Sequence, residues 1–159
     1  MFALSNYSLE DIMHFPLPTI TEQKKLCYRP GKADINHIYK QLNTYIFRNE
    51  LEMPKIEIRS HRKKYWGMCV GESEEIKDEG SCCEIKLMDK WFCPQWTVTI
   101  IAHEMAHQYQ WDILGPKRCR KGYEHLMSHG HSFFVFRERL EKHYIPLKTA
   151  HSMRRWFKY

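Results

Sequence analysis

The spacing of apolar residues predicts one long helix followed by three short strands. From residue 34 onward, apolar side chains recur at steps of three and four, which predicts an amphipathic helix over residues 34–50 that ends before Pro54. Residues 55–59 and 83–88 alternate apolar and polar positions, as half-buried strands do. We assign residues 64–70 to a strand between them and expect a small three-stranded antiparallel sheet.

Two further helices are predicted in the second half of the chain. One runs from residue 94 or 95 to residue 111 and is ended by the Gly-Pro pair at 115–116. The other covers residues 129–143, before Pro146, and follows a basic loop. Helix, small sheet, helix, loop and helix in this order predict an α+β fold.

The chain length of 159 residues suits one compact domain with short flanking segments. Residues 1–31 are interpreted as a lead-in, in which Ser8 and Asp11 have the spacing of a capping box at the start of a brief helix. Residues 32–145 form the main domain. Residues 146–159 form a basic and aromatic tail.

The segment His103-Glu104-Met105-Ala106-His107 carries the clearest chemical signal. Positions i and i+4 of a helix lie on one face, so both imidazoles can reach one tetrahedral metal ion. Zinc lowers the pKa of a water that it binds to about 7, and a carboxylate at Glu104 could accept its proton. We expect one Zn²⁺ per chain, with Glu104 as the general base.

A catalytic zinc needs a third protein ligand and one open position. The downstream candidates in the sequence are His125, His129, His131, Glu124 and Glu138. His129 falls on the same predicted helix face as Phe133, Phe136 and Leu140, which is the core-facing side. We choose His129 as the third ligand, with His131 as the alternative. For the group that stabilises the oxyanion, Tyr123, His125 and His61 remain equal candidates.

Composition narrows the possible environments of the chain. No apolar run approaches the roughly 18 residues of a membrane span, and the N-terminus lacks the basic and apolar layout of a secretion signal. The six cysteines form no CxxC pair, so we interpret them as reduced thiols rather than as a zinc ribbon or a disulfide framework. A cytoplasmic, nucleoid or nuclear location is expected.

The net charge of +6 is unevenly distributed. Residues 71–80 hold five acidic residues and one lysine, a local charge of −4, which leaves +10 on the rest of the chain. Basic clusters of this kind can engage the phosphates of DNA. The candidate DNA-contacting residues are Arg62, Lys63, Lys64, Lys117, Arg118, Arg120, Lys121, Arg154 and Arg155.

Two paired motifs resemble those of the SprT-like zinc metalloproteases, the family that includes Spartan. Residues 42–47 read Leu-Asn-Thr-Tyr-Ile-Phe, similar to the family's Leu-Asn-x-x-x-Phe pattern, and His129, Gly130 and Phe133 match its H-G-x-x-F element after the HExxH motif. The resemblance covers roughly residues 33–145. It implies a zincin-like fold, zinc ligation by His103, His107 and His129, and catalysis by Glu104.

The resemblance also implies proteolysis of proteins held on or crosslinked to DNA, a function in DNA repair. The chain would be a compact form without the family's C-terminal zinc ribbon, so its basic clusters would have to contact the DNA. The main alternative is a non-catalytic, zinc-containing DNA-binding or adaptor protein on the same scaffold. A third reading is a small metallopeptidase with no nucleic-acid role.

Overall fold

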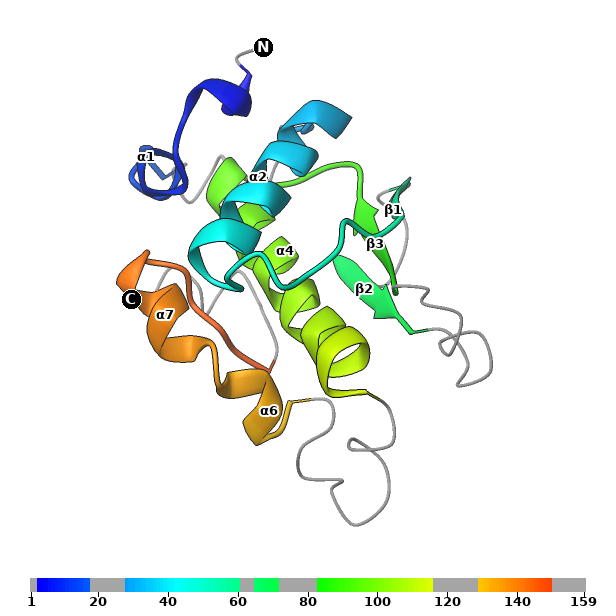
Figure 1. The fold of residues 1–159 in the computed structure, drawn as a ribbon. Coiled ribbons are helices and arrows are strands. Elements are labelled where there is room, and N and C mark those ends of the chain that lie inside the picture. The colour runs from blue at the N-terminus through cyan, green and yellow to red at the C-terminus, as the bar shows by residue number, and fades with distance from the viewer. Residues whose placement is uncertain (1–2, 18–27, 61–64, 72–82, 116–128, 150–159) are drawn as a thin grey trace.

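The computed structural model describes residues 3–17, 28–60, 65–71, 83–115 and 129–149, and Figure 1 shows their arrangement. The elements are η1 (Leu4–Asn6), α1 (Leu9–Met13), α2 (Lys32–Tyr45), β1 (Ile56–Arg59), β2 (Gly67–Val70), β3 (Glu84–Met88), α4 (Pro94–Tyr109), the π-helix η3 (Gln110–Leu114), α6 (His131–Phe134) and α7 (Arg137–Lys142). The predicted α+β class is confirmed.

The sheet has the order β1-β3-β2 and mixed directions. β1 pairs with β3 in parallel, and β2 pairs with β3 antiparallel. The expected all-antiparallel sheet is therefore wrong for β1. The alternation of apolar and polar residues along a strand identifies which side chains face the core. It does not determine which strands are neighbours in the sheet. Here Ile56 lies opposite Ile85, so β1 and β3 place apolar side chains on the same face of the sheet.

Helix α4 runs through the centre of the molecule, between α2, strand β2 and α6 (Figure 1). All its residues except Pro94, His107 and Tyr109 are buried, as expected for a helix that is covered on every side. The α-helical part ends at Tyr109, two residues before the predicted end, and continues as the π-helix η3. This helical segment ends at Gly115, which has φ of 83°, a left-handed value that glycine adopts without a steric penalty.

Helix α2 ends at Tyr45, earlier than the predicted residue 50. The side chain of Asn43 explains the early end because it binds the backbone of Leu51 twice. Its Nδ2 donates to Leu51 O at 2.7 Å, and Leu51 N donates to its Oδ1 at 3.2 Å. The intervening chain turns back through Arg48 and Asn49, which have φ of 56° and 59°.

The last predicted helix, residues 129–143, is divided into α6 and α7. The break falls at Val135 and Phe136, where Phe136 has φ of −89° and ψ of −5°. The predicted core-facing side chains of Phe133, Phe136 and Leu140 are nevertheless all buried. The apolar face is continuous across the break, although the hydrogen-bonded helix is not.

The described part of the lead-in packs at the N-terminal end of α4, far along that helix from α6 (Figure 1). The Ser8–Asp11 capping box is present. Asp34 on α2 accepts hydrogen bonds from Leu4 N at 2.8 Å and Gly31 N at 3.0 Å, and Gln95 Nε2 donates to Phe15 O at 2.7 Å. Lead-in side chains thereby enter the same core as the main domain.

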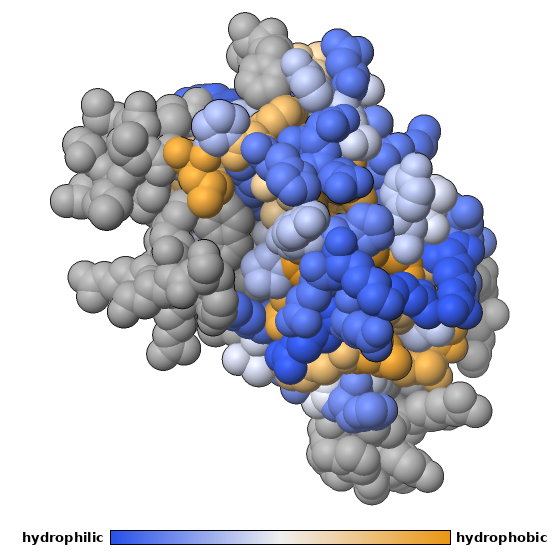
Figure 2. Space-filling model, turned by 90° about the vertical axis from the view of Figure 1, so that its left-hand side faces the viewer, coloured by the Kyte–Doolittle hydropathy of each residue, from blue (hydrophilic) through white to orange (hydrophobic). Residues whose placement is uncertain are grey.

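The face of the molecule in Figure 2 is mostly hydrophilic, with smaller hydrophobic patches between the hydrophilic side chains. On α7, Glu138, Glu141 and Lys142 are exposed. Among the described helices, none combines the length and apolar character that a membrane crossing requires.

Candidate metal centre

Three imidazoles from two parts of the chain meet beside the C-terminal half of α4. His103 and His107 lie one helical turn apart on α4, and His129 lies two residues before α6. The three ring centroids are 5.0 to 5.1 Å apart, and one ligand atom from each ring lies within 4.8 Å of the others. Three histidines are therefore close enough to hold one metal ion.

The spacing of one pair of ring nitrogens suits a tetrahedral ion. His103 Nε2 and His129 Nε2 are 3.2 Å apart. Two nitrogens bound to a tetrahedral zinc at about 2.05 Å lie roughly 3.3 Å from each other. The distance between His103 Nε2 and His129 Nε2 therefore fits two ligands of one tetrahedral ion.

The structure also places the other candidates for a third ligand. His131 is the exposed first residue of α6 and is not part of the cluster. Glu138 is exposed on α7 and pairs with Lys142 at 3.1 Å. His125 and Glu124 lie outside the described residues. Of the candidates that the structure describes, only His129 joins His103 and His107.

Burial keeps the two partly buried imidazoles in the form that binds metal. It lowers the pKa of His107, with a smaller lowering from the neighbouring His129, and the hydrogen bond to Gln110 acts in the opposite direction. Burial also lowers the pKa of His129. Both rings are therefore neutral at pH 7 and offer a nitrogen lone pair.

Gln110 fixes which nitrogen of His107 is available. Gln110 Nε2 donates to Ser132 Oγ at 2.8 Å, so its Oε1 faces His107 Nδ1, also at 2.8 Å. Since Oε1 can only accept, Nδ1 must carry the proton, and Nε2 keeps its lone pair for a metal. Sequence reasoning missed this role, although the i, i+3 spacing of His107 and Gln110 on a helix was a signal for it.

Glu104 is a buried carboxyl group directed toward strand β2. It is 6% exposed, and burial raises its pKa to about 8, against a lowering by the backbone N–H of Cys69, which donates to the carboxylate. Gly67 makes room for it, because a Cβ at that position would lie 3.0 Å from Glu104 Oε1 and 2.8 Å from Ile100 Cγ2. A carboxyl that is held near neutral pKa in this way is suited to accept and release a proton.

The register of the sheet explains how Cys69 reaches Glu104. Met88 N donates to Trp66 O, so the positions of β2 that hydrogen-bond to β3 alternate from Trp66 and exclude Cys69. The N–H of Cys69 therefore points away from β3, to the outer edge of the strand. Within the described residues β2 is an edge strand, and Glu104 lies against that edge.

The nine candidate DNA-contacting residues and the three candidate oxyanion-stabilising residues lie outside the described residues. They are Arg62, Lys63, Lys64, Lys117, Arg118, Arg120, Lys121, Arg154 and Arg155, and His61, Tyr123 and His125.

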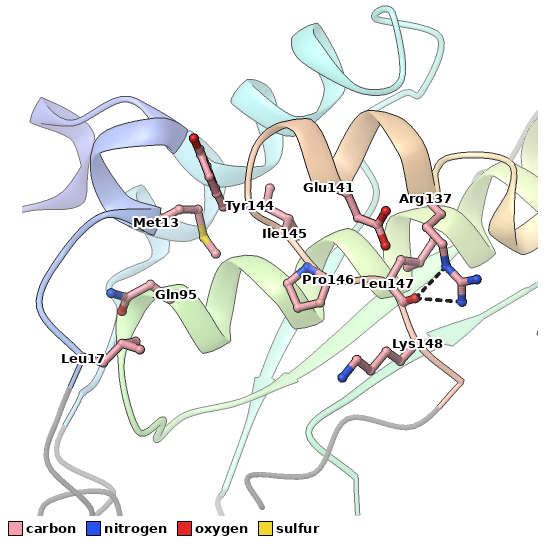
Figure 3. A pocket seen from close by; sticks show the side chains of 10 residues that line it. All are labelled: Met13, Leu17, Gln95, Arg137, Glu141, Tyr144, Ile145, Pro146, Leu147 and Lys148. Atoms are coloured by element: carbon pink, nitrogen blue, oxygen red, sulfur yellow. Dashed lines mark hydrogen bonds between the residues drawn. The ribbon is translucent and has the colours of Figure 1, made fainter. Parts of the chain in front are cut away.

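A cavity of about 580 Å³ lies elsewhere in the fold (Figure 3). Its walls include Met13 and Leu17 from the lead-in, Gln95 at the start of α4, and Arg137 on α7, which donates two hydrogen bonds to Leu147 O. Gln95 precedes His103 by two helical turns, so the cavity and the three histidines belong to different ends of α4.

No protein-family model matches this chain, and no curated protein matches its sequence.

Proposed function

We propose that this protein is a zinc-dependent metalloendopeptidase of the SprT-like type that cleaves proteins associated with or crosslinked to DNA. One observation carries the proposal. Three histidines are close enough to hold a single ion, and the residue that follows the first of them, Glu104, is a buried carboxyl group. A purely structural metal site has no need for such a carboxyl group beside it.

The donor set favours zinc. Three neutral imidazole nitrogens suit a tetrahedral ion that keeps its fourth position open, and a closed structural site would have a fourth protein ligand. Among the described residues only three ligands gather. Zinc bound there would polarise the scissile carbonyl and lower the pKa of a water that it binds.

Glu104 is the proton carrier in this proposal. It accepts a proton from the attacking water and delivers it to the nitrogen of the leaving amine. The pKa of about 8 applies to the site without a cation, and a nearby positive charge lowers a carboxyl pKa. The hydrogen bond from Cys69 N holds the carboxylate in place for both transfers.

The outer edge of β2 offers a place for an extended substrate. A peptide that paired with this edge would run beside Gly67, whose backbone approaches Glu104 closely enough that even a methyl group would touch it. This position would present successive peptide bonds to the carboxyl group. The absence of a side chain at Gly67 supports the proposal because it lets the Glu104 carboxyl group lie against the backbone of this strand.

The preference for DNA-associated substrates rests on charge and on the family resemblance. The chain outside residues 71–80 carries a charge of +10, concentrated in short basic clusters. Electrostatic binding to DNA would bring the enzyme to proteins on the same strand.

The test is cleavage of a basic DNA-binding protein by the zinc-loaded enzyme, with and without single-stranded DNA. Glu104→Gln keeps the shape of the side chain and an oxygen that accepts from Cys69 N, so we expect it to retain zinc and lose cleavage by a factor of at least about 100. Glu138→Gln, on the exposed surface of α7, is the matched control and should cleave at the wild-type rate.

The outcomes separate the parts of the proposal. Cleavage that requires both DNA and Glu104 supports it in full. Cleavage without DNA keeps the peptidase and removes the DNA-associated substrate. If the protein binds zinc and retains DNA in a salt-dependent way but never cleaves, the non-catalytic DNA-binding alternative replaces the enzyme.

A further inference from the structure

Two thiols lie in contact across the strands next to Glu104. Cys69 Sγ, on β2, is 3.0 Å from Cys83 Sγ, which immediately precedes β3. In the antiparallel register Cys69 lies opposite Ile85, so Cys83 is its diagonal neighbour two positions along. The two side chains occupy the same face of the sheet, because positions two apart on a strand point the same way.

The two cysteines differ in exposure. Cys69 is partly exposed on the edge strand, whereas Cys83 is 1% exposed. Cys69 is therefore the more accessible of the two residues to an oxidant in solution. An exposed attacking thiol with a second thiol in contact is the arrangement in which a mixed disulfide is resolved within the chain.

Both cysteines are also tied to groups around the metal centre. The N–H of Cys69 donates to Glu104, as described above. The N–H of Cys83 donates to Asp112 Oδ1 at 3.3 Å, and Asp112 Oδ2 accepts from Gln108 Nε2 of α4 at 3.1 Å. A bond between the two sulfurs would thus link two segments that each contact the HExxH helix or its continuation.

We infer that Cys69 and Cys83 are a reversible thiol modification site, which closes into a disulfide on exposure to a low-molecular-weight disulfide such as oxidised glutathione. The thiolate of Cys69 attacks the small disulfide, and one glutathione leaves as the thiol. The thiolate of Cys83 then attacks Cys69 Sγ, the bond to the second glutathione breaks, and that glutathione also leaves as the thiol. Two protein thiols are oxidised, one small disulfide is reduced, and the two protons end on the two glutathiones.

The geometry requires a small adjustment to make the bond. The two sulfurs must approach from 3.0 Å to about 2.05 Å. Cys83 lies just outside the β3 ladder, so it can shift with little loss of sheet hydrogen bonds. This inference does not depend on peptidase activity.

The first test uses the wild-type chain in glutathione buffers of increasing oxidised fraction. Acid trapping, alkylation of the remaining thiols and fragmentation of the peptides should show one internal disulfide, with the loss of two hydrogen atoms per chain. Fragmentation between Cys82 and Cys83 assigns the partner of Cys69. A link to Cys82, or alkylation of both Cys69 and Cys83 in buffers that are fully oxidised, would overturn the inference.

The second test uses single substitutions. In Cys83→Ser, Cys69 should accumulate as a mixed disulfide with glutathione, because the resolving thiol is gone. In Cys69→Ser, Cys83 should stay reduced because it is buried. Cys93→Ser, at another buried cysteine, is the matched control and should form the Cys69–Cys83 bond as the wild type does. Absence of the mixed disulfide in Cys83→Ser would contradict the assigned order of attack.

Discussion

The side-chain amide of Gln110 links the HExxH helix to the segment that carries His129. It accepts from His107 Nδ1 and donates to Ser132 Oγ, both at 2.8 Å, so it orients one proposed ligand and anchors the start of α6. Such outer partners determine the orientation and basicity of a ligating imidazole. Gln110 is therefore a positioning residue that acts through His107.

Gln110→Ala should weaken zinc binding by about 10- to 100-fold, because His107 loses the acceptor that fixes its tautomer. The measurement is competition for zinc against a chromophoric chelator of known affinity. Gln110→Glu keeps an acceptor at the same place and should recover most of the affinity. Equal affinity in the alanine variant and the wild type would remove Gln110 from the metal centre.

Glu104 should give the metal-free protein an unusual dependence of stability on pH. Its pKa is raised from 4.5 to about 8 in the folded state. Between these values the folded state binds more protons at this group than the unfolded state does. The contribution is therefore fully present below about pH 4.5 and is lost as the pH rises to 8, with a slope of up to about 1.4 kcal/mol per pH unit.

The comparison that isolates this effect is metal-free wild type against metal-free Glu104→Gln. Urea unfolding from pH 5 to pH 8 should show the difference in unfolding free energy between the two proteins change steadily in favour of the glutamine variant. A constant difference over this range would mean that Glu104 is ionised throughout in the folded protein.

Local spacing was enough to identify some of these residues and not others. The i, i+4 pair His103 and His107 follows from helix geometry alone, and the face shared with Phe133 singled out His129. The roles of Gly67 and of Cys69 N depend on how closely β2 approaches α4. That approach is a tertiary distance, and no repeat along the chain encodes it.

Local spacing likewise predicted some features of the helices and strands but not others. Apolar spacing and alternation predicted α2, β1 and β3, because the buried face of such an element is apolar in the sequence. They failed for the neighbours of β1, and for the end of α2, where a side chain competes with the helix for the backbone. Asn43, through its two hydrogen bonds to the backbone of Leu51, acts as the clamp that ends α2.

Asn43→Ala should destabilise the fold by about 2 to 3 kcal/mol, since the backbone N–H and C=O of Leu51 both lose their partner. Urea unfolding gives the value. Thr44→Ala is the neighbouring control: its hydroxyl makes an exposed bond to Asn49 Oδ1 at 3.0 Å, and its loss should cost less than about 0.5 kcal/mol. Similar losses in both variants would contradict the role of Asn43 as a clamp.

The described parts of the chain share one core despite the predicted division into lead-in, domain and tail. Leu4 and Ile12 from the lead-in and Leu147 from the segment after residue 145 belong to the same buried cluster as the residues of α4. The described residues on both sides of the predicted boundaries at 31 and 145 therefore contribute to one core. Stability measurements on this protein will report on these described parts together.

A metal ion bound by His107 and His129 would reduce the conformational entropy of the unfolded chain. His129 follows His107 by 22 residues, so an ion bound by both would join two distant points of the chain. By the entropy argument used for covalent links, a closed loop of that length is worth about 3 kcal/mol. The metal would act as a cross-link as well as a reactive centre.

Removal of zinc with a chelator should then accelerate amide hydrogen exchange most strongly in α6, which directly follows His129. Helix α7 should respond less, because Arg139 Nη1 donates to Ile46 O and Phe136 packs on Phe47 with ring centroids 4.5 Å apart. Exchange in α2 should not change. Equal acceleration in all three helices would mean global unfolding. A decrease in acceleration from α6 to α7 to α2 would mean that the ion stabilises the structure locally, by linking the α4 histidines to the segment that carries His129.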